Sequence, residues 1–320
     1  MPLAHYGGTI SVVLQLAGAS AACLCFAAYY TRAQVLSAHG RPVPGWRYAC
    51  FIAGLVVLLV ALSPPVDQIS DDVFAAHMAQ HLLIGDIAGL LLVLGLTGPL
   101  LQPILHLRWV ERLRPLTNPV PALSLWAINF YVWHIPFMYE AAYNNELVHA
   151  GQHITFLFFG SLMWMPLFGP LPKPAWFGNF AKLGYIIAVR LLGTLLGDVF
   201  LWSGSVFYGF YGAGEAKHGL SALHDQSAAG AVMMIEQSIL TICLFGWLFM
   251  RAAAQGEEKQ ELIEFAAARG IVLDERRAAR AVAAGRGDEL RRRLEARPRE
   301  SEPPQTREAA ATGGSARGES

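Results

Sequence analysis

Apolar residues fall in seven long stretches along the first 250 residues of the chain, separated by short polar segments. A helix needs roughly 20 predominantly apolar residues to cross a bilayer, and it satisfies its backbone polar groups internally. The sequence therefore predicts an all-α, polytopic integral membrane bundle of about seven transmembrane helices. The stretches cover residues 8–30, 48–65, 76–99, 118–138, 152–170, 182–203 and 226–250.

Basic residues gather in alternate loops of this predicted bundle. Such loops face the cytoplasm by the positive-inside rule, so we expect a multi-pass protein of the cell (inner) membrane with its N-terminus outside and its C-terminus cytoplasmic. The basic loop residues are Arg32, Arg41 and Arg47, then Arg108, Arg112 and Arg114, then Lys173 and Lys182.

The end of the chain has a different composition, because the last 70 residues carry 14 of the 24 basic and 13 of the 24 acidic side chains. Residues 1–250 are thus the predicted membrane domain and residues 251–320 a charged cytoplasmic tail. Interspersed Glu and Arg predict short helices at 257–269 and 274–297, and a Pro-, Gly- and Ser-rich composition predicts disorder from about residue 298. The run 291–293 predicts either contact with membrane lipids or a solvated charged face.

Histidine is concentrated at the predicted outer face, where eight of the ten histidines fall in outer loops or at the outer ends of spans. His77 and His81 share one helical face, since residues four apart are neighbours on a helix. If neighbouring spans pack together, they converge with His134 and His153 on an outward-facing metal site. Imidazole suits copper or zinc, and the thioethers of Met78 and Met233 would add soft ligands for Cu(I).

Four charged residues lie deeper in the predicted spans: Asp86, Arg190, Asp198 and Glu236. Charges at membrane depth usually pair, so we expect Arg190 to form an ion pair with Glu236 or Asp86 and to fix the packing of the third, sixth and seventh spans. A proton path through the carboxylates is the alternative. Nine residues from His77, Asp86 should point about 180° away on the helix, outside the histidine cluster.

Several short motifs together resemble the CtaG-type (caa-type) family of cytochrome c oxidase assembly factors. The resemblance extends over roughly residues 45–250. Its motifs are His77-Met78-x-Gln80-His81 before an apolar run to Gly98-Pro99, Trp133-His134-x-Pro136, His153 with Trp164, and Asp225-Gln226 with Gly230 and Met233.

The resemblance implies a non-enzymatic membrane protein that helps copper reach a haem-copper oxidase. Carried onto this sequence, it implies His77, His81, His134 and His153 as metal ligands. The remaining motif residues would orient or gate the site: Met78, Gln80, Asp225, Gln226 and Met233. The expected partners are subunits of the oxidase, an extracytoplasmic copper donor and membrane lipids, and no nucleic acid.

The absence of common catalytic motifs supports the non-enzymatic interpretation, since the sequence shows no nucleotide-binding glycine loop and no Cys-x-x-Cys pair. Two other functions remain alternatives to copper delivery. One is a haem-binding redox protein with paired imidazoles as axial ligands. The other is a metal-free scaffold for oxidase subunits that depends on helix contacts at small residues such as Gly85 and Gly230.

Overall fold

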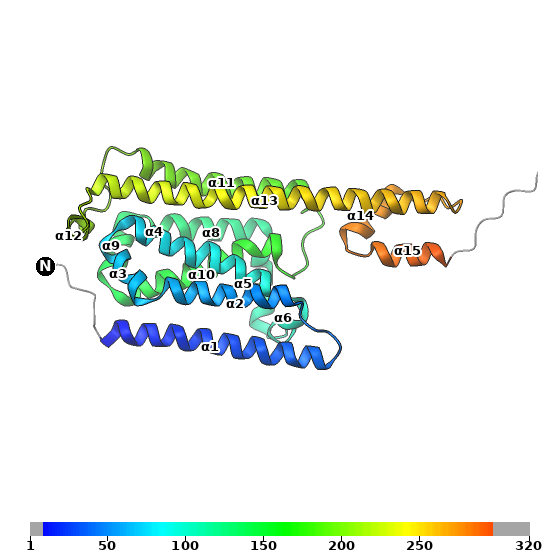
Figure 1. Ribbon diagram of the computed structural model, residues 1–320, viewed down its shortest axis with the longest axis horizontal. Helices are drawn as coiled ribbons and strands as arrows, with labels where there is room; N and C mark the ends of the chain where they lie inside the picture. Colours follow the sequence, from blue (N-terminus) through cyan, green and yellow to red (C-terminus); the bar gives the residue numbers. More distant parts are fainter. Residues whose placement is uncertain (1–8, 297–320) are drawn as a thin grey trace, which may run out of the picture. The chain divides into compact units, whose positions relative to one another are not determined.

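The computed structural model describes residues 9–296, and within them the backbone forms helices and no β-strand (Figure 1). The prediction of an all-α chain is confirmed. The chain divides into two compact units, Met1–Phe245 and Gly246–Ser320. The disorder predicted from about residue 298 lies outside the described residues.

Each predicted apolar stretch lies mostly on helical residues among those that the structure describes. The helices that begin in the first unit are α1 (Thr9–Ala38), α2 (Gly45–Ala61), α3 (Pro64–Asp72), α4 (Phe74–Leu82), α5 (Gly89–Gly95), α6 (Gly98–Leu105), α7 (Arg108–Leu113), α8 (Pro119–Trp133), α9 (Pro136–Asn144), α10 (Glu146–Phe168), α11 (Asn179–Trp202), α12 (Gly212–Lys217) and α13 (Ala222–Ala267). A π-helical turn, η1 (Leu83–Ala88), joins α4 to α5, and two 3₁₀ turns are η2 (Arg114–Thr117) and η3 (Gly209–Tyr211).

Among the described residues, fewer than seven helices are long and apolar enough to span a membrane. Among the described residues, four segments are long and apolar enough: Val12–Ala38, Phe74–Gly95, Asn179–Trp202 and Ala222–Ala267. The bent pair of α2 and α3 makes a fifth if it is one span. The predicted seven are not confirmed, because α8 has only 15 residues and α10 begins with polar residues. The fourth predicted span is also shorter than expected, since it breaks at His134 and restarts at Pro136 as α9.

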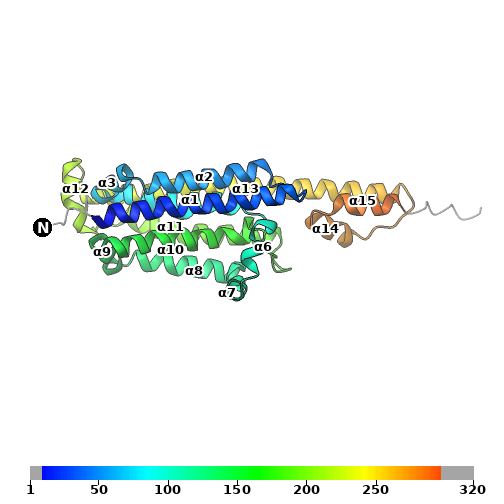
Figure 2. The ribbon, with the colours of Figure 1, turned by 90° about the horizontal axis from the view of Figure 1, so that it is seen from below.

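The centre of the first unit is the packing of α10 against α8, η1 and α5, while α2 packs on the other side of η1 and α5 (Figures 1 and 2). Two glycines permit close approach of helices. A β-carbon on Gly160 of α10 would clash with the carbonyl oxygen of Gly85 in η1. A β-carbon on Gly230 of α13 would lie 2.6 Å from the carbonyl oxygen of Gly197 in α11. Small residues therefore bring these backbones into direct contact.

The continuous segment α4–η1–α5 has chemically different ends. At its C-terminal end, the guanidinium of Arg47 donates to the carbonyl oxygens of Leu94 at 3.0 Å and Leu96 at 2.6 Å. A cation bonded to the last carbonyls stabilises a helix end. At the N-terminal end lie the histidines of α4. Arg47 lies on α2 rather than in the predicted loop, and it contacts the end of α4–η1–α5 that is opposite to the histidines.

The C-terminal unit contains α14 (Glu275–Ala283) and α15 (Gly287–Glu295). They pack with the end of α13 around a small core of Leu262, Ala266, Val282, Leu290 and Leu294. Two predicted boundaries are wrong. The helix predicted at 257–269 is the continuation of α13, because no proline interrupts the Ala-, Glu- and Gln-rich stretch that follows Arg251. The helix predicted at 274–297 divides at Gly285, whose φ of 66° ends α14.

Candidate metal centre

Two His-x-x-x-His pairs face each other across the contact between α4 and α10. Within each helix the ring centroids lie close together, at 4.2 Å for His77 and His81 and 4.3 Å for His149 and His153. Between the helices, the rings of His77 and His149 are 5.2 Å apart and those of His81 and His153 are 5.3 Å apart. We call these four residues the histidine cluster.

Three members of the histidine cluster can meet one metal ion. Each of His77, His81 and His149 offers a ring nitrogen, and these atoms all lie within 4.8 Å of one another. His77 and His81 are buried, and His149 is half-buried. Among the described residues, both ring nitrogens of His81 and Nε2 of His153 have no hydrogen-bond partner. Buried polar atoms without partners are costly and call for an explanation, and neutral imidazoles in this arrangement fit copper or zinc.

His134 has a different environment from the histidine cluster. Its Nδ1 lies 2.6 Å from the carbonyl oxygen of Phe130, one turn earlier in α8. With His81, it lines a small cavity of about 20 Å³ whose wall includes the thioethers of Met78 and Met233. The predicted ligand set therefore divides: His77, His81 and His153 lie together with His149, whereas His134 and the two methionines lie on this adjoining cavity.

Asp86 also lines the adjoining cavity, which contradicts the expectation that it points away from the histidines. The prediction assumed a regular α-helix from His77 to Asp86. The structure has a π-helical turn at Leu83–Ala88, which widens the helix and changes the direction of every later side chain. Such turns are often found at functional sites.

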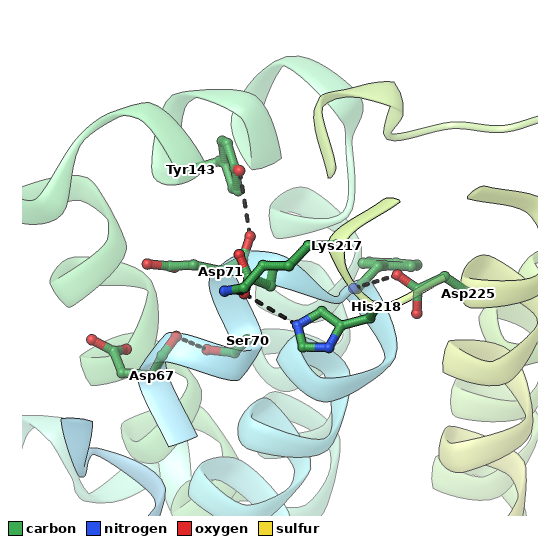
Figure 3. A network of polar contacts seen from close by, with 9 residues as sticks. Asp67, Ser70, Asp71, Tyr143, Lys217, His218 and Asp225 are labelled. Carbon is green, nitrogen blue, oxygen red and sulfur yellow. Dashed lines mark hydrogen bonds and ion pairs between the residues drawn. The ribbon is translucent and has the colours of Figure 1, made fainter. Parts of the chain in front are cut away.

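Asp225 holds the start of the helix that carries His77 and His81 (Figure 3). Val73, the N-cap residue of α4, provides no side-chain cap. Instead, the buried carboxylate of Asp225 on α13 accepts hydrogen bonds from the backbone N–H of Phe74 at 2.7 Å and of Ala75 at 3.0 Å. A carboxylate at a helix N-terminus also interacts favourably with the helix dipole. Asp225 thus positions the start of the helix that carries His77 and His81.

Both predicted glutamines connect segments that border the site. The side chain of Gln226 accepts from the backbone N–H of Phe207 at 2.8 Å and donates to the carbonyl oxygen of Ser205 at 2.9 Å. Gln80 donates to the carbonyl oxygen of Ala61 at 2.9 Å. Each amide is buried and replaces backbone hydrogen bonds that the loop and the end of α2 lack.

An aromatic layer covers the histidine cluster, and the sequence analysis did not predict it. The hydroxyls of Tyr139 and Tyr211 lie 2.7 Å apart, and the Tyr139 ring lies 5.2 Å from that of His77. The Tyr208 hydroxyl donates to the carbonyl oxygen of His134 at 2.7 Å. Because Tyr139 and Tyr211 are 72 residues apart, no local pattern could have indicated their contact.

A second layer of polar contacts joins α12 to α3 at the same end (Figure 3). Lys217 donates to the Asp72 carboxylate at 2.6 Å, and Nε2 of His218 lies 3.2 Å from the same oxygen. Exposed ion pairs of this kind contribute little to stability. Their effect here is to hold α12 near Asp225 and the start of α4.

Glu215 provides a pH-dependent test of this end of the unit. Burial raises the pKa of Glu215, and the neighbouring Asp225 carboxylate raises it further. A carboxyl with a higher pKa in the folded state stabilises the fold while protonated, and that contribution is lost as the pH rises from the unfolded-state pKa toward the folded-state pKa.

Near pH 7, we expect Glu215→Gln to raise the thermal unfolding midpoint by about 2–4 °C, with the difference vanishing near pH 4. Thermal melts in detergent across this range measure it. Glu140→Gln, which changes an exposed glutamate, is the control, and parallel pH profiles of wild type and Glu215→Gln would contradict the prediction.

A groove of about 640 Å³ borders the histidine cluster. Its walls are mostly apolar residues of α1, α2, α5 and α10, and its polar lining includes His149, His153 and Asp67. The cluster is therefore buried but not sealed, because two of its four rings line this open groove.

The deep charges form a different arrangement from the predicted ion pair. All four are half-buried, and among the described residues no ion pair joins Arg190 to Glu236 or Asp86. The guanidinium of Arg190 instead donates to Oε1 of Gln237 at 3.2 Å and to Oγ of Ser238 at 2.7 Å. Arg190 does link α11 to α13, as expected, but through neutral acceptors. Asp198 lies on α11 and lines neither the cavity beside His134 nor the cavity beside Arg190.

Together, the long apolar helices and the clustered imidazoles define a helical membrane protein with a candidate metal centre. The family model described as Cytochrome c oxidase caa3 assembly factor (Caa3_CtaG) matches residues 27–255, and the chain belongs to this family. It is thus a member of a family of assembly factors for cytochrome c oxidase. Neither a curated protein nor a solved structure matches the chain significantly.

Proposed function

We propose that the chain holds a copper ion at the histidine cluster and passes it to a haem-copper oxidase during assembly. The observation that carries this proposal is the convergence of ring nitrogens from His77, His81 and His149 within 4.8 Å. Membership of an oxidase assembly family supplies the context. The open groove lined in part by His149 and His153 offers a route for exchange, which a delivery site needs.

The proposal includes a membrane topology. We infer that α8 and α10 cross the membrane with the other spans, which gives seven, and that the histidine cluster faces the exterior of the cell (inner) membrane. The basic residue Arg47 lies at the opposite end of α4–η1–α5 from the cluster, which agrees with the positive-inside rule. An outward-facing site suits an extracytoplasmic copper donor, with oxidase subunits as recipients.

Copper is favoured over haem by the spacing of the rings. A haem with two axial histidines needs its flat macrocycle between them, whereas neighbouring rings of the cluster have centroids only 4.2–5.3 Å apart. Copper also suits the adjoining thioethers of Met78 and Met233, since soft ligands select Cu(I). Zinc shares the preference for imidazole and is distinguished by analysis of the bound metal.

Metal content tests the proposed function directly. After loading with copper, the detergent-purified full chain should hold about one copper ion per chain, as expected for one three-nitrogen centre. The variant His77→Ala/His81→Ala should hold none, and neither sample should show a haem absorption band. Mass spectrometry measures the metal, and His106→Ala, at an exposed position far along the sequence from the cluster, is the control. Equal copper in wild type and the double variant would overturn the proposal by placing the metal elsewhere, and no copper in either sample would overturn it in favour of a metal-free scaffold.

A further inference from the structure

Two carboxyl groups face a second cavity deeper in the bundle than the histidines. Asp86 of η1 and Glu236 of α13 both line this cavity, which has a volume of about 30 Å³. That volume holds one or two water molecules, because a single water needs at least about 10–15 Å³ of this kind of space. Arg190 and Gln237 complete the polar part of the wall, and the rest of the lining is apolar apart from the Thr241 hydroxyl and two indoles.

Glu236 lacks the partners that an ionised carboxylate requires. Both of its side-chain oxygens are buried, and neither has a hydrogen-bond partner among the described residues. The one cation on the cavity wall, Arg190, directs its hydrogen bonds to Gln237, Ser238 and the carbonyl oxygen of Met234 instead. An unpaired buried charge is very costly. A protonated carboxyl avoids that cost and gains an O–H donor for a neighbouring acceptor or a water.

Asp86 connects this cavity with the one beside the histidines. Asp86 and Trp126 line both cavities. Met163 lies on the wall of the deeper cavity, and His134 lies on the wall of the cavity beside the histidines. The π-helical turn makes this possible, because it brings Asp86 to the side of the helix on which His81 lies. His81 and Asp86 therefore share one cavity, and Asp86 and Glu236 share the next.

We propose that Asp86 and Glu236 form a proton-binding site in the membrane domain, connected through the two cavities to the side of the bundle that carries the histidine cluster. The charged groups that face the site are these two carboxyls, from η1 and α13, and Arg190, from α11. Asp198 acts on Arg190 electrostatically from the same helix. The elements α8 and α10 contribute only uncharged side chains to the cavity wall. This site does not depend on copper, so it can be tested separately from the proposed function.

Infrared spectroscopy of the metal-free full chain tests the proton site. A protonated carboxylic acid has a carbonyl stretch separate from that of an ionised carboxylate, and the band shifts in D₂O. Near neutral pH, the wild type should show this band, Glu236→Gln should lose the intensity of one carboxyl, and Asp86→Asn should shift the band that remains. Asp198→Asn, which neutralises a half-buried carboxyl that lines neither cavity, should leave it unchanged.

Two controls keep the test decisive. Glu236→Asp retains a carboxyl at the same place and should show a displaced band, even if the glutamine variant folds poorly. Size-exclusion profiles identify variants that do not fold. A wild-type spectrum without a protonated carboxyl band near neutral pH would overturn the proposal. A Glu236→Gln spectrum equal to that of a folded wild type would also overturn it.

Discussion

Replacing His149 by alanine should weaken copper binding as strongly as replacing His77, by at least about 100-fold. The reason is that each variant removes one of the three ring nitrogens that lie within 4.8 Å of one another, and even residues that merely support a metal ligand typically contribute 10–100-fold to affinity. Competition with a chelator of known Cu(I) affinity measures the dissociation constant of each purified variant.

His134→Ala is the informative comparison for this prediction. His134 belongs to the sequence motif, but its Nδ1 is engaged by the Phe130 carbonyl oxygen and it lies on the adjoining cavity. We expect its loss to reduce affinity by about 10-fold or less, the lower end of the range for supporting residues. His106→Ala should have no effect. If His134→Ala abolished binding while His149→Ala left it intact, the metal would lie on the cavity beside Met78 and Met233 instead.

Asp225→Asn should destabilise the protein and weaken metal binding together. An amide has one acceptor oxygen, whereas the carboxylate accepts from both Phe74 and Ala75, so one buried N–H loses its partner. That loss costs about 1–3 kcal/mol, and the loss of charge at the start of α4 adds up to about 2 kcal/mol. A total near 2 kcal/mol lowers the unfolding midpoint by about 4–8 °C for a unit of this size.

The second half of this prediction separates positioning from general stability. Copper affinity measured well below the midpoint should fall by about 10-fold, as for other residues that orient metal ligands, because the first turn of α4 leads directly to His77. The control is Asp274→Asn in the C-terminal unit. Asp274 caps α14 through a single hydrogen bond from the backbone N–H of Arg277, which an asparagine preserves. Unchanged copper affinity in folded Asp225→Asn would show that Asp225 supports the fold alone.

The sequence by itself determined the helical class, the family and the first histidine pair. Apolar stretches near 20 residues leave a membrane helix as the main solution, and most of the described residues in those stretches are helical. A spacing of four places His77 beside His81 on any helix. The same rule applies to His149 and His153, so the sequence also indicated the second pair, although the family motif includes His153 and not His149.

Only the tertiary structure decided which residues share the site. The packing of α10 against η1, permitted by Gly160, brings His149 rather than His134 to the first pair. The π-helical turn redirects Asp86, and the position of α11 beside α13 determines that Arg190 bonds to Gln237 and Ser238. Asp225 reaches α4 across about 150 residues of chain. Local periodicity reports the face of a single helix, whereas these contacts depend on the rotation and register of several helices at once, which side-chain packing sets.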